Sequence, residues 1–182
     1  QKAPEFNIDA FHNNDVKRIN LNDYKGKWLI LAFYPADFTF VCPTELGELA
    51  DRYEELKQLN TEVISISTDT VYVHKAWHDD SPTIKKVTYP MGSDPSGKMS
   101  KAFETYIEDQ GLSIRATFII DQDGIIKAYD IHDNSIGRSA NEIIRKLKAM
   151  QHVRDNGEQA CPANWKPGEK TLKPSLDLVG KI

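Results

Sequence analysis

The chain has 182 residues, 40% of them hydrophobic and 27% charged, which is typical of one globular domain with a sizeable core. Its 23 basic and 27 acidic side chains give a net charge of -4, so no broad positive surface favours nucleic acid as a partner. No apolar run approaches the roughly 20 residues that span a bilayer, and no secretory signal pattern opens the chain. We therefore expect a cytoplasmic protein that binds neither nucleic acid nor a membrane.

The first half of the chain carries the pattern of a parallel crossover unit. Residues 28 to 34 (WLILAFY) form a continuous apolar run, which predicts a strand buried on both faces at the centre of a sheet. Apolar residues then recur every three or four positions from Cys42 to Leu59, which predicts one amphipathic helix. Residues 62 to 67 (EVISIS) indicate a second buried strand. Two strands joined by a helix at this spacing are expected to pair in parallel.

The middle of the chain predicts an antiparallel addition to this sheet. Short helices are expected over residues 70 to 79 and 97 to 106. Residues 116 to 120 and 125 to 130 indicate strands, and the Asp-Gly in the turn at 121 to 124 favours a hairpin between them. The sheet is therefore expected to be mixed.

A helix and an irregular arm are predicted at the C-terminal end. Ser139 with Glu142 three residues later forms a capping-box pattern, and the apolar periodicity that follows runs to about Val153. Residues 154 to 182 contain several Gly and Pro residues and show neither helical nor strand periodicity. The order of elements predicts an α/β protein with a thioredoxin-like fold. In this prediction, residues 1 to 153 form a domain with a mixed central sheet flanked by helices, and residues 154 to 182 form a C-terminal extension.

The two cysteines, Cys42 and Cys161, are too few for a disulfide scaffold and form no C-x-x-C pair. The ordinary interpretation of such a pair is two inert thiols. Cys42, however, precedes Pro43, a residue favoured in the first turn of a helix, where free backbone N–H groups and the helix dipole favour an anion. Because the thiolate is the reactive form, this position together with a fixed cation predicts a nucleophilic cysteine.

Four residues are candidate partners of the Cys42 sulfur. Arg115, at the edge of a core strand, is the candidate cation, and Glu45, one helical turn after Cys42, is positioned to hold it. Thr39 stands three residues before Cys42 and offers a hydroxyl to a substrate, while Pro35 turns the chain after the central strand and shields the thiol from water. Taken singly, each also fits a purely structural role, such as a helix cap or a solvated charge.

Together these residues form the pattern P-x-x-x-T-x-x-C within FYPADFTFVCPTEL, residues 33 to 46. With STDTVYVHKAWHDD, RATFIID and the ending EQACPANWKPGEKTL, this pattern makes nearly the whole chain resemble the typical two-cysteine peroxiredoxins of the bacterial alkyl hydroperoxide reductase type. The resemblance implies that Cys42 is the peroxidatic cysteine, that Pro35, Thr39 and Arg115 complete its pocket, and that Cys161 is the resolving cysteine of a partner subunit.

The resemblance also implies an activity and a set of partners. It implies a peroxidase that reduces hydrogen peroxide and organic hydroperoxides to water and alcohols through a sulfenic acid and an intersubunit disulfide, and so protects against oxidative stress. It implies no bound cofactor, with reducing equivalents coming from NADH through a flavoprotein disulfide reductase or from thioredoxin. The expected assembly is a homodimer, and five such dimers are expected to form a ring-shaped decamer.

One departure from the family leads to a separate expectation. Relatives that are sensitive to overoxidation carry a Gly-Gly-Leu-Gly segment and a C-terminal Tyr-Phe motif, whereas this chain has EDQGL at residues 108 to 112 and ends in LVGKI. We therefore expect the helix start at Cys42 to unfold more easily and the protein to resist hyperoxidation.

Three other readings remain open at this stage. A chaperone-like oligomeric binding protein is the main alternative to an enzyme. A metal site would need His residues at ligand spacing from the cysteines, which the chain lacks, and a thioredoxin-type reductase would need a C-x-x-C pair. The aromatic side chains near the site, Phe38, Phe40 and Trp77, are expected to serve packing, although the resemblance also places them near subunit interfaces.

Overall fold

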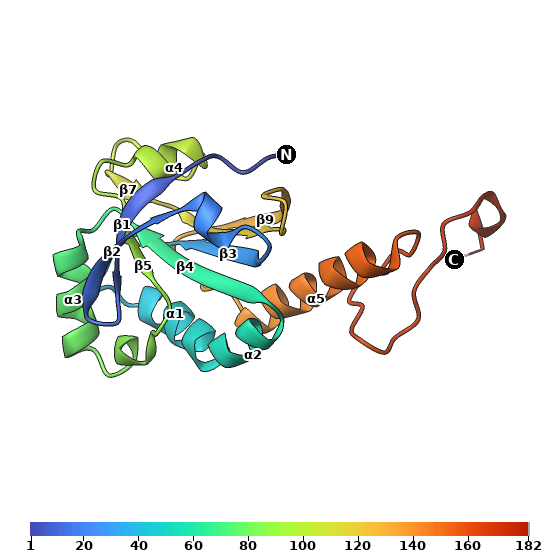
Figure 1. The fold of residues 1–182 in the computed structure, drawn as a ribbon, viewed down its shortest axis with the longest axis horizontal. Helices are drawn as coiled ribbons and strands as arrows, with labels where there is room; N and C mark the ends of the chain where they lie inside the picture. Colours follow the sequence, from blue (N-terminus) through green and yellow to red (C-terminus); the bar gives the residue numbers. More distant parts are fainter. Residues whose placement is uncertain (182) are drawn as a thin grey trace. The chain divides into compact units, whose positions relative to one another are not determined.

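A computed structural model describes residues 1 to 181; Ile182, the last residue of the predicted arm, lies outside the described residues. The chain divides into two compact units, the first from Gln1 to Ser139 and the second from Ala140 onward (Figure 1). Over the described range, no helix combines the length and the apolar character needed to cross a membrane.

The first unit is built on a seven-stranded sheet with the order β2-β1-β5-β4-β3-β8-β9. Its strands are β1 (Asn7–His12), β2 (Asp15–Asn20), β3 (Trp28–Phe33), β4 (Thr61–Ser67), β5 (Met91–Ser93), β8 (Arg115–Ile120) and β9 (Ile126–His132). The pair β3 and β4 and the pair β4 and β5 are parallel, and the remaining pairs are antiparallel. The predicted mixed sheet, the parallel crossover and the hairpin of β8 and β9 are therefore confirmed.

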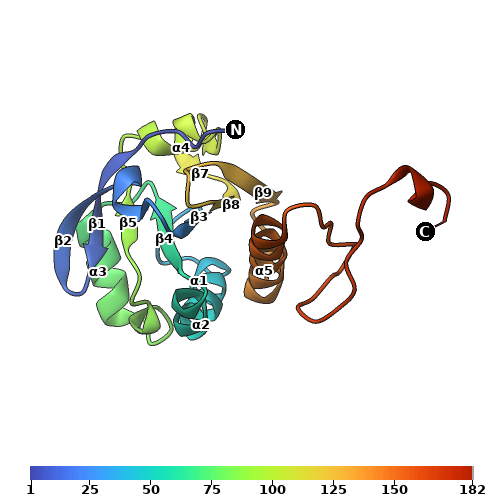
Figure 2. The same cartoon turned by 45° about the vertical axis from the view of Figure 1, so that its right-hand side comes forward.

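Helices cover both faces of this sheet. The helices of the first unit are α1 (Cys42–Asp51), α2 (Tyr53–Gln58), α3 (Val71–Asp80) and α4 (Lys98–Ala102), with 3-10 turns η1 (Leu21–Tyr24) and η2 (Ile84–Lys86). The second unit contains α5 (Ala140–Asn156) and the 3-10 turn η3 (Leu176–Leu178). Figures 1 and 2 show α1, α2 and α3 on one side of the sheet and α4 on the other. On the α4 side, Met99 and Phe103 join the same apolar cluster as Leu31, Phe33 and Phe118 of the central strands.

Two predicted helices differ from the observed ones. The helix expected from Cys42 to Leu59 is broken at Arg52, whose amide bonds to the carbonyl of Leu49, three residues back, as in a 3-10 turn. The helix expected over residues 97 to 106 ends at Ala102, because Glu104 adopts a left-handed conformation with φ of 57°. The amides after the helix end bond back to Ser100 and Lys101 in a Schellman arrangement, so the local backbone overrides the apolar periodicity.

Short strands and turns account for what the sequence patterns did not predict. The hairpin of β1 and β2 turns at Asn13 and Asn14, which both have positive φ, as a two-residue hairpin turn requires. The strand β5 and the separate pair β6 (Tyr106–Ile107) and β7 (Leu112–Ser113) are only two or three residues long. Segments of this length carry no readable periodicity.

The pairing of the central strands brings distant parts of the chain to one edge. Phe33, at the end of β3, lies opposite Ala116, next to the start of β8. Because these strands are antiparallel, the chain that leaves β3 toward Cys42 meets Arg115 at the same edge of the sheet. Every residue of β3 and β8 is buried, so this edge is held by the rigid centre of the sheet.

Candidate active site

Cys42 is the first residue of α1, and its side chain is fully buried. Pro43 follows in the first turn, and the amides of Thr44 and Glu45 bond to the carbonyl of Val41. No side chain caps the start of this helix. The predicted position of Cys42 at a helix N-terminus is therefore confirmed, in the field of backbone dipoles that favours an anion.

Arg115 contacts the Cys42 sulfur directly. Its Nη1 lies 3.3 Å from Sγ of Cys42 and 2.6 Å from Oε2 of Glu45. Its Nε donates to the carbonyl of Asn134 at 2.8 Å, and the residue is only 3% exposed. A guanidinium fixed at three points and shielded from water stabilises a thiolate more strongly than a solvated cation does.

Glu45 is shared between Arg115 and a second arginine, Arg138. Arg138 donates to Oε1 of Glu45 from Nε at 2.8 Å and from its backbone amide at 2.7 Å, and to Oε2 from Nη2 at 3.0 Å. Burial alone would raise the pKa of Glu45, but the hydrogen bonds and charge of Arg138, with the charge of Arg115, outweigh it and hold that pKa below its usual value. Glu45 is therefore a buried carboxylate that orients Arg115.

Arg138 is the residue of this cluster that the sequence reading missed. Its Nη1 also donates to the carbonyl of Ala116 at 2.8 Å and to Oγ1 of Thr117 at 3.1 Å, so it ties Glu45 to β8. It lies 93 positions from Glu45 in the sequence. Its place just before Ser139, the predicted start of the last helix, is the only local signal, and that signal points to no function.

The segment from Pro35 to Val41 forms the loop that leads into α1. Pro35 is buried after β3, in agreement with the predicted turn. Oγ1 of Thr39 donates to the carbonyl of Ala36 at 2.9 Å, so this hydroxyl closes the loop. Pro35 and Thr39 thus lie in the loop beside Cys42, and their roles toward a substrate stay predictions.

A buried polar network beneath this loop anchors it to α3. Asp37 accepts hydrogen bonds from the hydroxyl of Tyr34 at 2.6 Å and from Nδ1 of His74 at 2.7 Å. Nε2 of His74 lies 3.1 Å from the carbonyl of Gly92, so both ring nitrogens of His74 face oxygen atoms. Burial, followed by the charge of Asp37, raises the pKa of Tyr34 well above its usual value. This network gives His74 a structural role.

The aromatic residues near the site differ in exposure. Trp77 is buried and packs near Tyr34 and Phe38, as expected. Phe38 and Phe40, however, are 53% and 93% exposed. Within this chain the expected packing role therefore holds for Trp77 but not for Phe40, and the interface role that the resemblance implies for Phe40 stays a prediction.

Cys161 belongs to the second unit and is a free thiol, as is Cys42. Its Sγ points to the carbonyl of Ala149 on α5, at 3.8 Å. Partial burial raises the pKa of the Cys161 thiol, and the nearby charge of Arg145 offsets part of that effect. Cys161 therefore rests as a protonated thiol.

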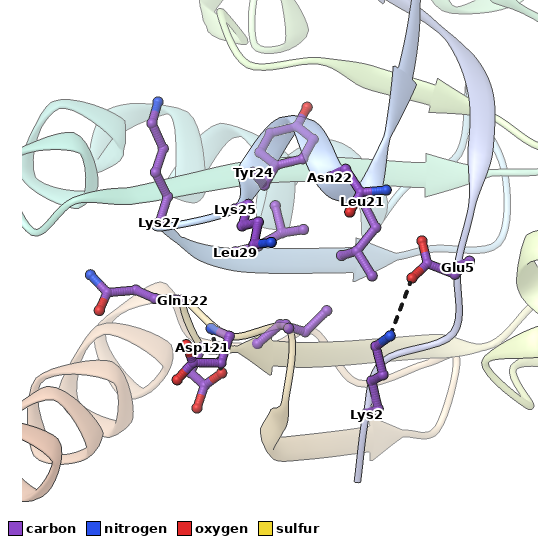
Figure 3. A pocket seen from close by; sticks show the side chains of 13 residues that line it. Lys2, Glu5, Leu21, Asn22, Tyr24, Lys25, Lys27, Leu29, Asp121 and Gln122 are labelled. Atoms are coloured by element: carbon purple, nitrogen blue, oxygen red, sulfur yellow. Dashed lines mark hydrogen bonds and ion pairs between the residues drawn. The ribbon is translucent and has the colours of Figure 1, made fainter.

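The described residues show no metal centre, and a pocket elsewhere in the first unit does not involve the cysteine site. Among residues 1 to 181, no three His, Cys, Asp or Glu side chains gather in a way that would hold a metal ion. A pocket of about 120 Å³ lies between η1, the turn before β9 and the N-terminal segment (Figure 3), and it includes neither Cys42 nor Arg115. Its rim mixes the opposite charges of Lys2, Glu5 and Asp121, which do not converge on one ligand.

Comparison with known proteins agrees with this geometry. Residues 1–129 match the AhpC/TSA family, and residues 149–181 match the C-terminal domain of 1-Cys peroxiredoxin. The chain is 51% identical over 181 residues to alkyl hydroperoxide reductase C of Salmonella typhimurium, covering 100% of this chain and 97% of the relative. The corresponding protein of Bacillus subtilis is also 51% identical, over 97% of this chain and 95% of that one.

A solved structure is similar over most of its length as well. The crystal structure of Enterococcus faecalis AhpC is 48% identical and matches with a TM-score of 0.86, over 89% of this chain and 97% of that one. The reduced 2-Cys peroxiredoxin of Plasmodium vivax is 35% identical and matches with a TM-score of 0.93, over 97% and 93% of the two chains. The predicted thioredoxin-like fold is thus confirmed.

Proposed function

The chain belongs to the AhpC/TSA family and is a thiol-dependent peroxidase, and from this premise we propose that Cys42 is the peroxidatic cysteine and Cys161 the resolving one. The observation that carries the assignment is the Arg115 guanidinium, buried and 3.3 Å from the Cys42 sulfur at the start of α1. The relatives named above are reductases and peroxiredoxins, and nothing in these matches supports the chaperone-like alternative.

The first step is attack of the Cys42 thiolate on the terminal oxygen of a hydroperoxide. An S–O bond forms and the O–O bond breaks, so that Cys42 becomes a sulfenic acid and the departing oxygen takes up a proton, leaving as water or an alcohol. Arg115 stabilises the charge that moves from sulfur to the leaving oxygen, and Glu45 with Arg138 holds Arg115 in place. Pro35 excludes water from the thiol, and Thr39 turns its hydroxyl to the bound peroxide.

The second step is the formation of a disulfide between Cys42 and the Cys161 of a partner subunit. The Cys161 sulfur displaces the hydroxyl of the sulfenic acid, and the thiol proton leaves with that hydroxyl as water. The two sulfurs must come within about 2.05 Å of each other. Because Cys42 is buried in the first turn of α1, that turn has to unfold before the disulfide forms.

The assembly and the reductant complete the proposal. The chain forms a homodimer and, through the exposed aromatic residues of the loop before α1 and of α3, a ring of five dimers.

Residues 1 to 153 are the peroxiredoxin domain and residues 154 to 182 the arm that carries Cys161, an assignment that the separate family match of residues 149–181 supports. No cofactor is bound, and electrons come from NADH through a flavoprotein disulfide reductase, with thioredoxin as the second candidate.

Single cysteine variants test the two assignments. Cys42→Ser is expected to abolish peroxide consumption, measured as peroxide-dependent NADH oxidation with the flavoprotein reductase or thioredoxin system added separately. Cys161→Ser is expected to consume one peroxide per chain and to form no covalent dimer on non-reducing gels. Turnover by Cys42→Ser, or a covalent dimer in Cys161→Ser, would contradict the corresponding assignment.

A further inference from the structure

The chain that leaves β9 forms a tight turn beside Arg115. The carbonyl of Asp133 accepts a hydrogen bond from the amide of Ile136 at 3.0 Å, and Oδ1 of Asp133 accepts one from the amide of Ser135 at 2.7 Å. Asn134 is therefore the second residue of a β-turn that Asp133 stabilises twice. The side chain and the carbonyl of Asn134 make their contacts outside this turn.

Both oxygen atoms of Asn134 accept hydrogen bonds from Arg115. Oδ1 accepts from the backbone amide of Arg115 at 3.2 Å, and the carbonyl accepts from Nε of the same residue at 2.8 Å. The first bond joins the turn to the first residue of β8, and the second holds the guanidinium itself. One residue thus fixes Arg115 at its backbone and at its side chain.

The bond to Nε determines where the rest of the guanidinium lies. The group is planar, so a hydrogen bond at Nε sets the direction of all its other N–H donors. With Nε held, Nη1 lies 3.3 Å from the Cys42 sulfur and 2.6 Å from Oε2 of Glu45. Without the Asn134 carbonyl, the bond to Glu45 alone would hold the guanidinium beside the sulfur.

The residues that follow the turn pack against the start of α1. A β carbon at Gly137 would lie 3.3 Å from Cγ1 of Val41, so the glycine allows a close approach to the N-cap of the helix. The next residue, Arg138, donates its backbone amide to Oε1 of Glu45 at 2.7 Å. The segment from the turn to Arg138 therefore contacts the cation of the site at one end and its carboxylate at the other.

We propose that Asn134 is a positioning residue of the peroxidase reaction, which acts through Arg115 by holding the guanidinium against the Cys42 sulfur. The inference rests on the proposed role of Cys42 and adds a residue that makes no contact with the sulfur. A donor that is oriented before the peroxide binds needs no reorganisation when charge moves from sulfur to oxygen. Asn134 thus sets how much of the time Arg115 is in the reactive orientation.

Two substitutions remove the Oδ1 bond without introducing a charge. Asn134→Ala truncates the side chain, and Asn134→Leu keeps its approximate size. Each is expected to lower the second-order rate constant of the first step with hydrogen peroxide, because the turn no longer holds its carbonyl against Nε. The expected loss is roughly three- to tenfold, the effect of one lost hydrogen bond. Stopped-flow kinetics of the first turnover measure this constant.

A double variant separates positioning from a general loss of structure. Arg115→Met leaves no guanidinium to hold, so adding Asn134→Ala to it is expected to leave the already reduced rate constant unchanged. The pH profile of this constant is expected to move to higher pH in Asn134→Ala alone, because the cation then favours the thiolate less. In the double variant the profile is expected to match that of Arg115→Met.

Asn20→Ala is the matched control. Oδ1 of Asn20 also accepts a hydrogen bond from a backbone amide, at 3.0 Å, but Asn20 ends β2, at the opposite edge of the sheet from β9. In denaturant titrations, Asn20→Ala is expected to lower the unfolding free energy about as much as Asn134→Ala does. The rate constant of the first step is expected to stay the same.

The outcomes distinguish this inference from the function on which it rests. An unchanged rate constant in Asn134→Ala and Asn134→Leu overturns the positioning role. An equal fold loss in the wild-type and Arg115→Met backgrounds overturns it as well, because Asn134 would then not act through Arg115. Peroxide turnover by Cys42→Ser would instead overturn the role of Cys42 itself.

Discussion

At the scale of single residues, one nitrogen of Arg115 serves two purposes. Its Nη1 contacts both the Cys42 sulfur and a Glu45 oxygen, so the same group that favours the thiolate is oriented by the carboxylate. Arg138 completes the arrangement by occupying both oxygens of Glu45. Two arginines around one carboxylate leave a net positive charge next to the sulfur, which a single ion pair would not provide.

The direct contact predicts the effect of removing the guanidinium. Arg115→Met is expected to lower the second-order rate constant for the reaction with hydrogen peroxide roughly 100-fold, because a fixed donor at the developing charge is lost. Stopped-flow kinetics of the first turnover measure this constant. Arg115→Lys keeps the charge but lacks the planar guanidinium, so its rate constant is expected to lie between those of the wild-type protein and Arg115→Met. An unchanged rate constant in Arg115→Met would count against the role of the contact.

The lowered pKa of Glu45 predicts how stability depends on pH. Because the pKa of Glu45 is lower in the folded than in the unfolded chain, its contribution is complete above the ordinary carboxyl range, about pH 4.3, and is lost as the pH falls through the folded-state pKa. Glu45→Gln, which leaves two buried arginines without their carboxylate, is expected to cost about 3–5 kcal/mol of unfolding free energy at pH 7.

Denaturant titrations of the wild-type protein and Glu45→Gln at pH 7 and pH 3 measure both quantities. The difference in unfolding free energy between the two proteins is expected to shrink at the lower pH, because below about pH 4.3 the unfolded chain is protonated at this carboxyl and the contribution of the ionised form falls. An equal difference in unfolding free energy at pH 7 and pH 3 would show that the ionised form of Glu45 contributes no stability. Glu54→Gln, the same substitution at an exposed ion pair with Lys57, is the matched control.

At the scale of elements, the loop before α1 is held firmly, whereas the first turn of α1 has no side-chain cap. The loop before it is held from below by Asp37 and His74, whereas no side chain caps the first turn. A helix terminus without a cap unfolds more readily than its interior. This allows Cys42 to leave its buried position while the loop and the sheet stay folded.

The segment at residues 108 to 112 bears on the same step. Its residues 108 to 111 form the short turn between β6 and β7, and Leu112 begins β7. The segment lacks the Gly-Gly-Leu-Gly sequence of relatives that are easily overoxidised. We expect the first turn of α1 to open quickly, and the fraction of Cys42 converted to sulfinic acid to stay small during cycling with millimolar hydrogen peroxide. Mass spectrometry of the peptide that contains Cys42 measures this fraction, and its conversion within a few turnovers would refute the expectation.

At the scale of the whole molecule, exposed aromatic side chains mark the surface through which we propose that dimers meet. Phe38 and Phe40, from the loop before α1, and Tyr72, from α3, are all exposed, and Phe40 reaches 93%. Large apolar side chains gathered next to an active site are unusual on a monomer. Their burial between dimers would support the loop from outside as His74 supports it from inside.

This surface predicts the effect of a polar substitution on assembly. Phe40→Ser is expected to shift the protein from the proposed ring of five dimers toward free dimers, because the buried apolar area of each contact between dimers is reduced. Sedimentation velocity measures the distribution of species. Val16→Ser, which removes an exposed apolar side chain from β2, is the control, and equal distributions for the two variants would contradict the assignment of this surface.

Much of the fold could be predicted because its elements carry local patterns. The buried run of β3 and the Asp-Gly turn before β9 are readable in a few residues, and they led to the mixed sheet. The break at Arg52 and the end of α4 at Ala102 were not predicted, since backbone geometry decided them against the apolar periodicity. The two- and three-residue strands are too short for any pattern to show.

The sequence by itself determined where the proposed nucleophile lies and what its immediate setting is. A cysteine before proline, at the point where a buried strand gives way to a helix, specifies a thiol at a helix N-terminus, and the motif around it specifies the family. Only the tertiary structure decided which charges meet that thiol and how Cys161 is held. Arg138 reaches Glu45 across 93 positions and His74 reaches Asp37 across 37, because strand pairing and helix packing join them, and no local pattern records such contacts.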